Sequence, residues 1–266
     1  MEMAYSLKSS SQPMASIQGG NDTDDVWSGS VSSDIYYGSV GDDQLRGGFG
    51  DDDLYGGNDN DDLYGDSGND HLIGSNGDDH IYGGAGIDES SYEGQIAQYN
   101  LLLTANGIQI ADSDATRDGD DVLESVERIH FEDVSLAFDV DGAGGQAYRL
   151  YRAAFDRESD DEGLGFWIAQ LEHGSSLSGV ASAFVASDEF QSLYGNYCTD
   201  EQFVDLLYNN VLNRDADSEG FEFWTTHLNG NLRREDVLVC FSESTENQNN
   251  VVELIASGIT YQEYLV

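Results

Sequence analysis

The sequence is poor in basic residues, proline and cysteine. Its 266 residues include one proline and ten basic side chains against 52 acidic ones, which gives a formal net charge of −42. A protein with so few basic side chains has no patch to hold the phosphate backbone of DNA or RNA, so nucleic acid is excluded as a partner. Repulsion among so many carboxylates destabilises a compact state unless cations neutralise them, and we therefore expect bound cations.

Long hydrophobic runs are also absent. No stretch approaches the about 18 apolar residues that a membrane-spanning helix needs. Residues 1–16 lack the basic and apolar regions of a secretory signal peptide, and we expect residues 1–18 to form a disordered tail. Two cysteines are too few to staple a small secreted domain, and the sequence leaves open whether Cys198 and Cys240 pair. Cys240, in Val-Leu-Val-Cys-Phe, is expected to be a small buried hydrophobic side chain.

A period of nine residues runs without insertion from Gly20 to Ser91 and produces eight consecutive units. Every unit begins with glycine, and the eighth position is apolar in seven of the eight units. A disordered low-complexity tract would not keep these positions in register, so the period predicts a repeat architecture. The sixth position is always aspartate: Asp25, Asp34, Asp43, Asp52, Asp61, Asp70, Asp79 and Asp88.

The residue types in each unit predict a calcium-binding loop followed by a short strand. Glycine at the start tolerates positive φ and lets main-chain carbonyl groups approach a ligand. A carboxylate beside such carbonyls offers the oxygen ligands that Ca²⁺ prefers over Zn²⁺. Positions seven to nine alternate one inward apolar side chain with two outward ones, as a very short strand does.

These units closely resemble the RTX, or haemolysin-type, calcium-binding nonapeptide. The unit Gly47-Gly48-Phe49-Gly50-Asp51-Asp52-Asp53-Leu54-Tyr55 matches that motif at every specified place. The resemblance implies a right-handed parallel β-roll over residues 19–91, in which two units make one turn and Ca²⁺ lies between like loops of adjacent turns. The fourth position, where the motif has glycine, holds Thr23 in the first unit, Ser32 in the second and Asp59 in the fifth, so the amino-terminal sites match the motif least well.

Two units per turn separate the aspartates into two ladders of four. Four loops enclose three gaps in each ladder, which predicts on the order of six bound Ca²⁺ ions. If each carboxylate bridges two ions, Asp61 serves two sites and the terminal Asp25 serves one. Residues 19–91 carry 18 acidic side chains and a single basic one, Arg46, so we expect the roll to fold only when calcium binds. His71 and His80 should lie on opposite sheets, beside Asp53 and Asp62 respectively.

Residues 92–140 should form a β cap on the roll. Residues 99–110 read as a hairpin with an Asn-Gly turn, and Val122-Leu123 and Ile129-His130-Phe131 offer strands to cover the exposed sheet edges. Residues 127–133 resemble the segment that commonly follows RTX repeats. We therefore expect this segment to end the roll.

Residues 141–266 show helical periodicity and an internal duplication. Residues 157–167 match residues 214–224 at a shift of 57, which divides the domain into related halves at about 143–198 and 199–256. Asp215, Asp217, Glu219 and Gly220 imitate the opening of an EF-hand, but Thr226 stands where its closing glutamate should be, so we expect Asp160 and Asp217 to cap helices instead. This half resembles a helical family of undefined function found in secreted RTX, adhesin-like and S-layer-associated proteins.

The predicted function is that of an exported calcium-binding protein with a cell-surface, matrix or secretion role and no catalysis of its own. The RTX resemblance implies type I secretion machinery as a partner, and residues 259–266 resemble the uncleaved signals of that route. One alternative is the carboxyl-terminal module of an extracellular enzyme, although the sequence has no His-Glu-x-x-His and no Gly-x-Ser-x-Gly. Another is an adhesive module that binds glycan, polysaccharide or an S-layer through outward stripes at Tyr37, Tyr55, Ile73 and at Tyr64, Tyr82.

Overall fold

The computed structural model describes residues 17–114, 116–195 and 198–264, and the chain divides into two compact units between Glu132 and Asp133. The expected disordered tail lies outside the described residues except at its end. There the expectation is wrong, because Ile17–Gly19 forms a strand, β1, whose Ile17 lies opposite Ile35 of the next strand in the same sheet.

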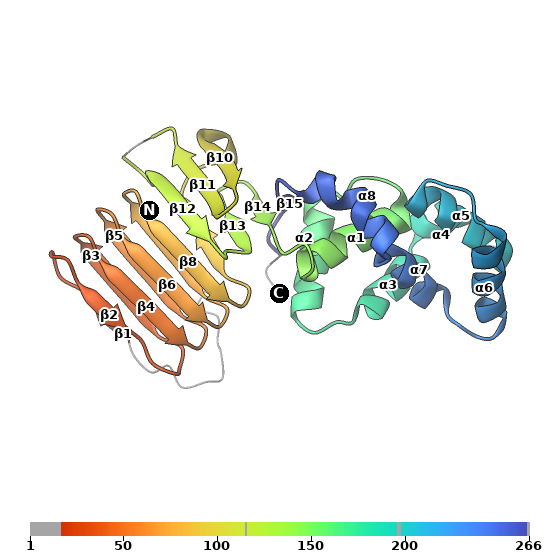
Figure 1. The fold of residues 1–266 in the computed structure, drawn as a ribbon, viewed down its shortest axis with the longest axis horizontal. Coiled ribbons are helices and arrows are strands. Elements are labelled where there is room, and N and C mark those ends of the chain that lie inside the picture. The colour runs from red at the N-terminus through yellow and green to blue at the C-terminus, as the bar shows by residue number, and fades with distance from the viewer. Residues whose placement is uncertain (1–16, 115, 196–197, 265–266) are drawn as a thin grey trace. The chain divides into compact units, whose positions relative to one another are not determined.

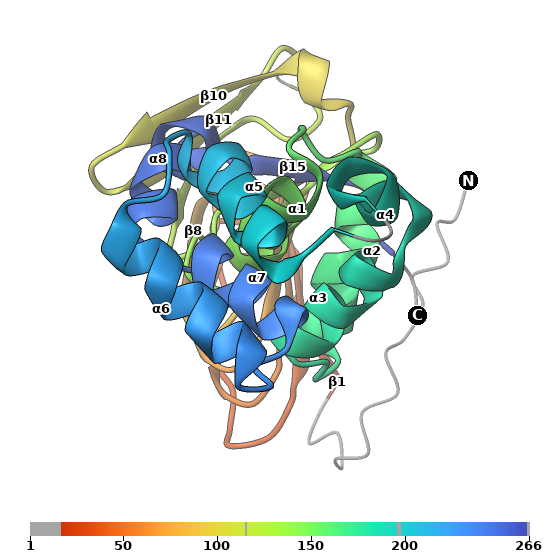
Figure 2. The same cartoon turned by 90° about the vertical axis from the view of Figure 1, so that its right-hand side faces the viewer.

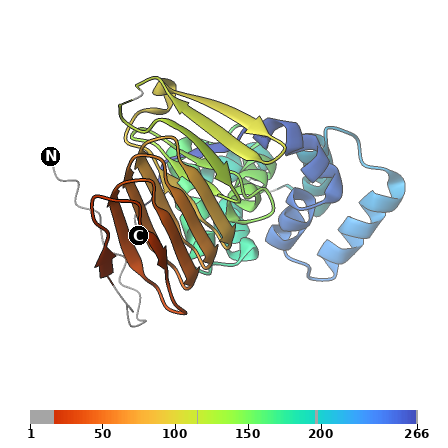
Figure 3. The same cartoon turned by 60° about the vertical axis from the view of Figure 1, so that its left-hand side comes forward.

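The first unit contains a parallel roll in which successive strands alternate between two sheets (Figures 1 and 3). One sheet has the order β1-β3-β5-β7-β9, and the other has the order β8-β6-β4-β2. Partners lie 18 residues apart, as Leu45 and Leu63 do, so two units make one turn as expected. The remaining strands are β2 (Val26–Ser28), β3 (Ile35–Val40), β4 (Gln44–Phe49), β5 (Asp53–Asn58), β6 (Asp62–Ser67), β7 (His71–Asn76), β8 (His80–Ala85) and β9 (Glu89–Ser91).

The core of the roll is a single layer of side chains from the eighth repeat position. Each of these side chains points between the sheets and lies directly over its equivalent one turn away, because parallel pairing in register repeats the same inward position. The five central ones are completely buried: Leu45, Leu54, Leu63, Leu72 and Ile81. Such a thin core leaves the loops at the two edges of the sheets to supply much of the remaining stability.

The cap follows as η1 (Ile96–Gln98), β10 (Tyr99–Thr104), β11 (Gly107–Asp112), β12 (Asp120–Glu124) and β13 (Arg128–His130). Strand β12 pairs in parallel with β8, and β13 pairs in parallel with β9, so each sheet of the roll continues into a cap strand. These pairings confirm the predicted capping role of residues 122–123 and 129–130.

The hairpin of the cap differs from the expected Asn-Gly turn in its detail. Thr104 lies opposite Gly107, so the two loop residues are Ala105 and Asn106, and Gly107 begins β11 with φ of 138°. A Cβ atom at residue 107 would lie 2.0 Å from the carbonyl oxygen of Leu123. Glycine is therefore required there by the close approach of β12 as well as by its φ angle.

The described residues of the second unit form mainly helices, eight in number and arranged along the chain as two sets of four (Figure 2). The first residues of α1 to α4 and of α5 to α8 differ by 57 in every pair, which confirms the duplication. A short antiparallel pair of β14 (Ser135–Ala137) and β15 (Ile259–Tyr261) adds strands to this otherwise helical unit. The helices are α1 (Ala143–Phe155), α2 (Asp161–Glu172), α3 (Leu177–Ala186), α4 (Asp188–Tyr194), α5 (Asp200–Leu212), α6 (Ser218–Asn229), α7 (Arg234–Ser242) and α8 (Thr245–Ile255).

The EF-hand-like loops of this unit act as helix caps. The Asp160 carboxylate accepts a hydrogen bond from the Gly163 N–H at 2.7 Å, and the Asp217 carboxylate accepts one from the Gly220 N–H at 2.8 Å. Both copies therefore use the aspartate to satisfy the first turn of a helix. The buried core includes side chains from both halves, such as Phe184 and Phe241.

Cys198 and Cys240 are both free thiols. The expectation that Cys240 is buried is wrong, because α7 turns Val237, Leu238 and Phe241 toward the core and leaves residue 240 on its exposed face. No helix among the described residues has the length and apolar character needed to cross a membrane.

Candidate metal sites in the roll

The sixth-position aspartates form two ladders, each linked by hydrogen bonds from one turn to the next. The backbone N–H of Asp43 donates to Oδ1 of Asp61 at 2.8 Å, and the N–H of Asp52 donates to Oδ1 of Asp70 at the same distance. Every such bond runs from one aspartate to the aspartate 18 residues later. One oxygen of each acceptor carboxylate is therefore committed to holding adjacent turns together.

The second oxygen, Oδ2, has no hydrogen-bond partner in six of these carboxylates. Their residues are at most 2% exposed, and a buried charged oxygen without a partner is costly. Burial raises the pKa of Asp61 to about 8 and that of Asp70 to about 7, although the hydrogen bonds from the backbone partly oppose this effect. The six orphaned oxygens belong to Asp43, Asp52, Asp61, Asp70, Asp79 and Asp88.

Main-chain carbonyl oxygens approach the same places. A Cβ atom on Gly56 would lie 2.2 Å from Oδ2 of Asp61 and 2.9 Å from the carbonyl oxygen of Gly74, one turn later. The carboxylate of one turn and the carbonyl of the next thus meet in space that only glycine leaves open. A carboxylate with carbonyl oxygens is the donor set of a hard cation such as Ca²⁺, so these residues fit the ion.

Side chains alone would not complete such a site. Across the part of the chain that the structure describes, no three His, Cys, Asp or Glu side chains converge as a metal cluster. A cation in the roll would therefore draw its other ligands from main-chain carbonyls and water, as Ca²⁺ commonly does. The role of the eight aspartates as metal ligands remains a prediction.

The two aspartates at the amino-terminal end of the ladders differ from the other six. Oδ2 of Asp25 accepts a hydrogen bond from the Asn21 N–H at 2.9 Å, and Oδ2 of Asp34 accepts one from the Ser30 N–H at 2.8 Å. These local bonds satisfy the oxygen that is left unpaired in the later units. The first and second units are also the ones that have Thr23 and Ser32 at the fourth position, where the motif has glycine.

The outward faces of the roll carry the expected pairs. Nδ1 of His71 lies 3.6 Å from a carboxylate oxygen of Asp53 in one sheet, and Nδ1 of His80 lies 3.4 Å from Asp62 in the other. Such exposed pairs contribute little to stability. The outward tyrosines stack across strands, and the rings of Tyr64 and Tyr82, for example, have centroids 4.7 Å apart.

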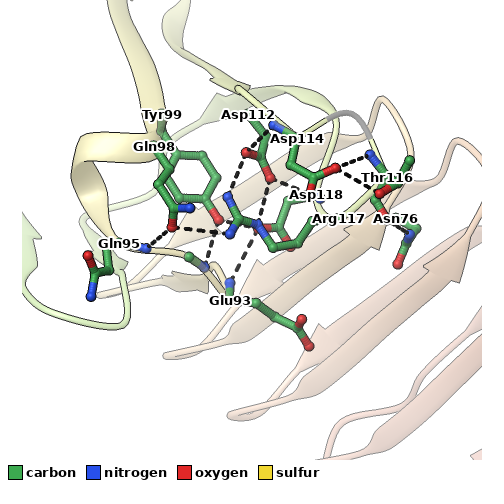
Figure 4. A network of polar contacts seen from close by, with 11 residues as sticks. Asn76, Glu93, Gln95, Gln98, Tyr99, Asp112, Asp114, Thr116, Arg117 and Asp118 are labelled. Carbon is green, nitrogen blue, oxygen red and sulfur yellow. Dashed lines mark hydrogen bonds and ion pairs between the residues drawn. The ribbon is translucent and has the colours of Figure 1, made fainter.

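The cap holds a polar network in which an arginine, Arg117, neutralises the acidic side chains (Figure 4). The guanidinium of Arg117 donates to both carboxylate oxygens of Asp112 and lies 3.5 Å from Asp118, which also accepts a hydrogen bond from the Tyr99 hydroxyl. Against the effect of burial, the hydrogen bonds from Arg117 hold the pKa of Asp112 below its usual value. Asn76 at the end of β7 donates to the carbonyl oxygen of Thr116 and ties this network to the roll.

Two acidic residues that the sequence analysis missed extend the ladders into the cap. Oδ1 of Asp121 accepts the N–H of Asp79 at 2.9 Å, and Oε2 of Glu127 accepts the N–H of Asp88 at 3.0 Å. A signal for the first was present, because Gly119-Asp120-Asp121-Val122-Leu123 has the residues of repeat positions four to eight. This signal was missed because the hairpin segment separates residues 119–123 from the last repeat unit, so they do not continue the period of nine.

Comparison with known families agrees with this architecture. Residues 28–63 and 55–89 match the RTX calcium-binding nonapeptide repeat, and residues 181–251 match a domain of unknown function, DUF4214. The chain therefore carries RTX repeats followed by a DUF4214 domain, and the predicted resemblance is confirmed.

The similarity of this chain to individual known proteins is low. A crystal structure of the extracellular lipase LipA from Serratia marcescens is similar at 14% identity with a TM-score of 0.21, and the match covers 49% of this chain and 18% of the lipase. A search of curated protein sequences finds no match.

Proposed function

We propose that this chain is an exported calcium-binding protein whose roll folds when it meets extracellular calcium and binds about six ions. The observation that carries the proposal is the row of six buried carboxylate oxygens without partners. A cation at each would replace the missing hydrogen bonds and neutralise the ladders. Calcium supplies positive charge and accepts six to eight oxygen ligands there.

The charge of the roll supports a coupling between folding and calcium. Without cations, the folded state must bury aspartates at intervals of one turn, and burial raises the pKa of Asp52 and Asp88 to about 7. Extracellular calcium modules bind at about 10⁻⁴ to 10⁻³ M, so such a roll is unfolded in a low-calcium cytosol and folded outside the cell.

The RTX repeats support a role in an exported protein, and we assign this chain to the cell surface or the extracellular matrix. Type I secretion machinery is its proposed route, and a cell-surface polysaccharide or S-layer is its proposed surface partner. The helical unit, with its own core, would serve as the attachment or secretion module. The proposal gives the chain a structural role and no catalytic step.

Calcium titration of the full chain tests the central claim. Circular dichroism in the β region should change cooperatively as calcium rises to about 10⁻³ M, and the same concentration of Mg²⁺ should not produce the change. Isothermal titration calorimetry on the same samples gives the number of ions bound. A chain that shows the full β signal in chelator and no heat with calcium would sink the proposal.

A further inference from the structure

The loop that leads into β12 reproduces the repeat geometry one turn beyond the last repeat of its ladder. The Val122 N–H donates to the carbonyl oxygen of Asp79 at 2.9 Å, as the His80 N–H donates to that of Asp61 at 2.8 Å one turn earlier. A Cβ atom on Gly119 would lie 1.8 Å from the carbonyl oxygen of Gly77. Glycines at the fourth position of the repeats have the same relation to the turn before them, since a Cβ atom on Gly86 would lie 1.8 Å from the carbonyl oxygen of Gly68.

The segment before β13 reproduces the other edge of the roll. A Cβ atom on Gly83 would lie 2.0 Å from the carbonyl oxygen of Ser125 and 2.7 Å from Oδ2 of Asp88. Within the repeats, the equivalent atom on Gly65 would lie 2.6 Å from the carbonyl oxygen of Gly83 and 2.4 Å from Oδ2 of Asp70. The Ser125 carbonyl therefore stands where the first glycine of a further repeat would place its own.

The orphaned oxygens mark the gaps between turns in which a buried carboxylate oxygen has no hydrogen-bond partner. Five of the six Oδ2 atoms lie near the same glycine Cβ position as a carbonyl oxygen of the next turn, as Oδ2 of Asp43 and the carbonyl oxygen of Gly56 do beside Gly38. The last orphans in the two ladders, on Asp79 and Asp88, belong to residues that are completely buried and that face cap residues. The first gap of each ladder has no orphan, because Oδ2 of Asp25 and Oδ2 of Asp34 accept local hydrogen bonds.

We propose that the cap closes two divalent-cation sites that the repeats by themselves leave incomplete. One lies between Asp79 and Asp121, and the other lies among Asp88, the Ser125 carbonyl and Glu127. The inference rests on the proposed calcium binding by the roll. The inferred number of sites stays at about six, but the first gap of each ladder is replaced by a gap between the last repeat and the cap. Residues outside the nonapeptide repeats thereby become part of the calcium-binding structure.

A consequence is that the cap and the roll fold together on calcium. Asp121 and Glu127 hold the backbone N–H groups of Asp79 and Asp88 and place a second negative charge at each last gap. The free energy of cation binding contributes to folding when the site exists only in the folded state. Filling these two sites therefore stabilises the pairing of β12 with β8 and of β13 with β9.

Charge-removing variants of the full chain test this assignment. Asp121→Asn and Glu127→Gln keep an oxygen that can accept the backbone N–H but lose the negative charge. Glu124→Gln and Glu132→Gln, on partly exposed and exposed cap residues, are matched controls with the same charge change. Calorimetric titration with calcium should show that each ladder variant loses about one ion, while the controls keep the wild-type number.

The outcomes separate this inference from the proposed function. If wild type binds calcium and both ladder variants keep the full number of ions at wild-type affinity, the cap sites are wrong while calcium binding by the roll stands. If wild type binds no calcium, the proposed function itself fails.

A measurement on the wild-type chain keeps the test independent of whether a variant folds. In crystals grown with calcium, anomalous difference maps should show a peak within about 2.6 Å of Oδ2 of Asp88 and of the Ser125 carbonyl oxygen. A second peak should lie against Oδ2 of Asp79. Peaks in the interior gaps with none at these two places would overturn the inference.

Discussion

The backbone N–H of Asp43 donates to Oδ1 of Asp61 across one turn of the roll at 2.8 Å, while Oδ2 of the same Asp61 carboxylate has no partner. The two oxygens of one side chain thus have different tasks. Oδ1 fixes the spacing of adjacent turns, and Oδ2 is left for a ligand that brings positive charge. This division makes the ladder both a structural element and a row of candidate cation sites.

Removal of calcium should unfold one unit and spare the other. On the proposed function, the roll needs cations to neutralise its ladders, whereas the helical unit has a core of buried apolar residues such as Phe203 and Leu207. Amide hydrogen exchange of the full chain in chelator should therefore show loss of protection in β3 to β8 and continued protection in α1 to α8. Equal loss in both units would show that the helical unit also requires calcium.

Substitution of Asp61 should cost more than substitution of Asp25. Asp61→Asn keeps an oxygen for the Asp43 N–H but removes the orphaned charge, so we expect the loss of at least about one ion and a higher calcium midpoint. Asp25→Asn is the matched control, because Oδ2 of Asp25 is already bound by the Asn21 N–H. Calorimetric stoichiometry decides the question, and equal losses for the two variants would contradict the structural difference between them.

A methyl group at a loop glycine should block a site without changing charge. The Cβ of Gly56→Ala would lie 2.2 Å from Oδ2 of Asp61, in the space where carboxylate and carbonyl meet. We expect calcium affinity to fall by about 10- to 100-fold, the range for changes beside metal ligands. Gly19→Ala is the control, since nothing lies within 4 Å of its Cβ position. Unchanged calcium affinity in Gly56→Ala would argue against a site there.

Acid should partly replace calcium in the roll. Burial raises the pKa of Asp61 from 3.8 to about 8 and that of Asp70 to about 7, so the folded roll favours their protonated forms. Their contribution to stability is therefore fully present below pH about 4 and is lost as pH rises through about 7 to 8. In chelator, the roll should therefore recover part of its β signal at pH 5 and lose it at pH 8.

Calcium should reverse this order, because its carboxylate ligands must be deprotonated to bind. In saturating calcium, the same β signal should melt at a higher temperature at pH 8 than at pH 5. A roll that is more stable at pH 8 in both conditions would show that the ladder carboxylates are ionised without calcium.

Within the helical unit, an ion pair with a buried arginine and a partly buried glutamate should matter more than an exposed pair. Arg149 is 3% exposed, and its Nε lies 2.9 Å from a carboxylate oxygen of Glu243. Arg149→Ala leaves that carboxylate and the Val140 carbonyl without their donor and should cost about 3–5 kcal/mol of unfolding free energy. Arg157→Ala, which breaks the more exposed pair with Glu189, should cost about 1 kcal/mol or less.

Urea unfolding of the full chain in saturating calcium, followed at 222 nm, compares the two variants. Similar losses of unfolding free energy in the two variants would mean that burial does not determine how much these ion pairs contribute to stability.

The sequence by itself determined the roll, because a strict period of nine imposes the same constraints on every turn. Glycine, aspartate and an inward apolar residue at fixed places decide the strand register, and the stacking of Leu45 on Leu63 follows from that spacing. The shift of 57 residues likewise determined the two sets of four helices, since each copy carries its own caps and core positions.

Only the tertiary structure decided how the ladders begin and end. Asp121 lies 42 residues after Asp79, and Glu127 lies 39 residues after Asp88, so no period could assign them to the ladders. At the other end, local hydrogen bonds from the Asn21 backbone N–H and side-chain amide satisfy Asp25, although the sequence presents Asp25 as equivalent to Asp61. Residue spacing fixes which side chains share an edge of the roll. Which of their oxygens remains without a partner depends on atoms that the folded chain brings together from elsewhere.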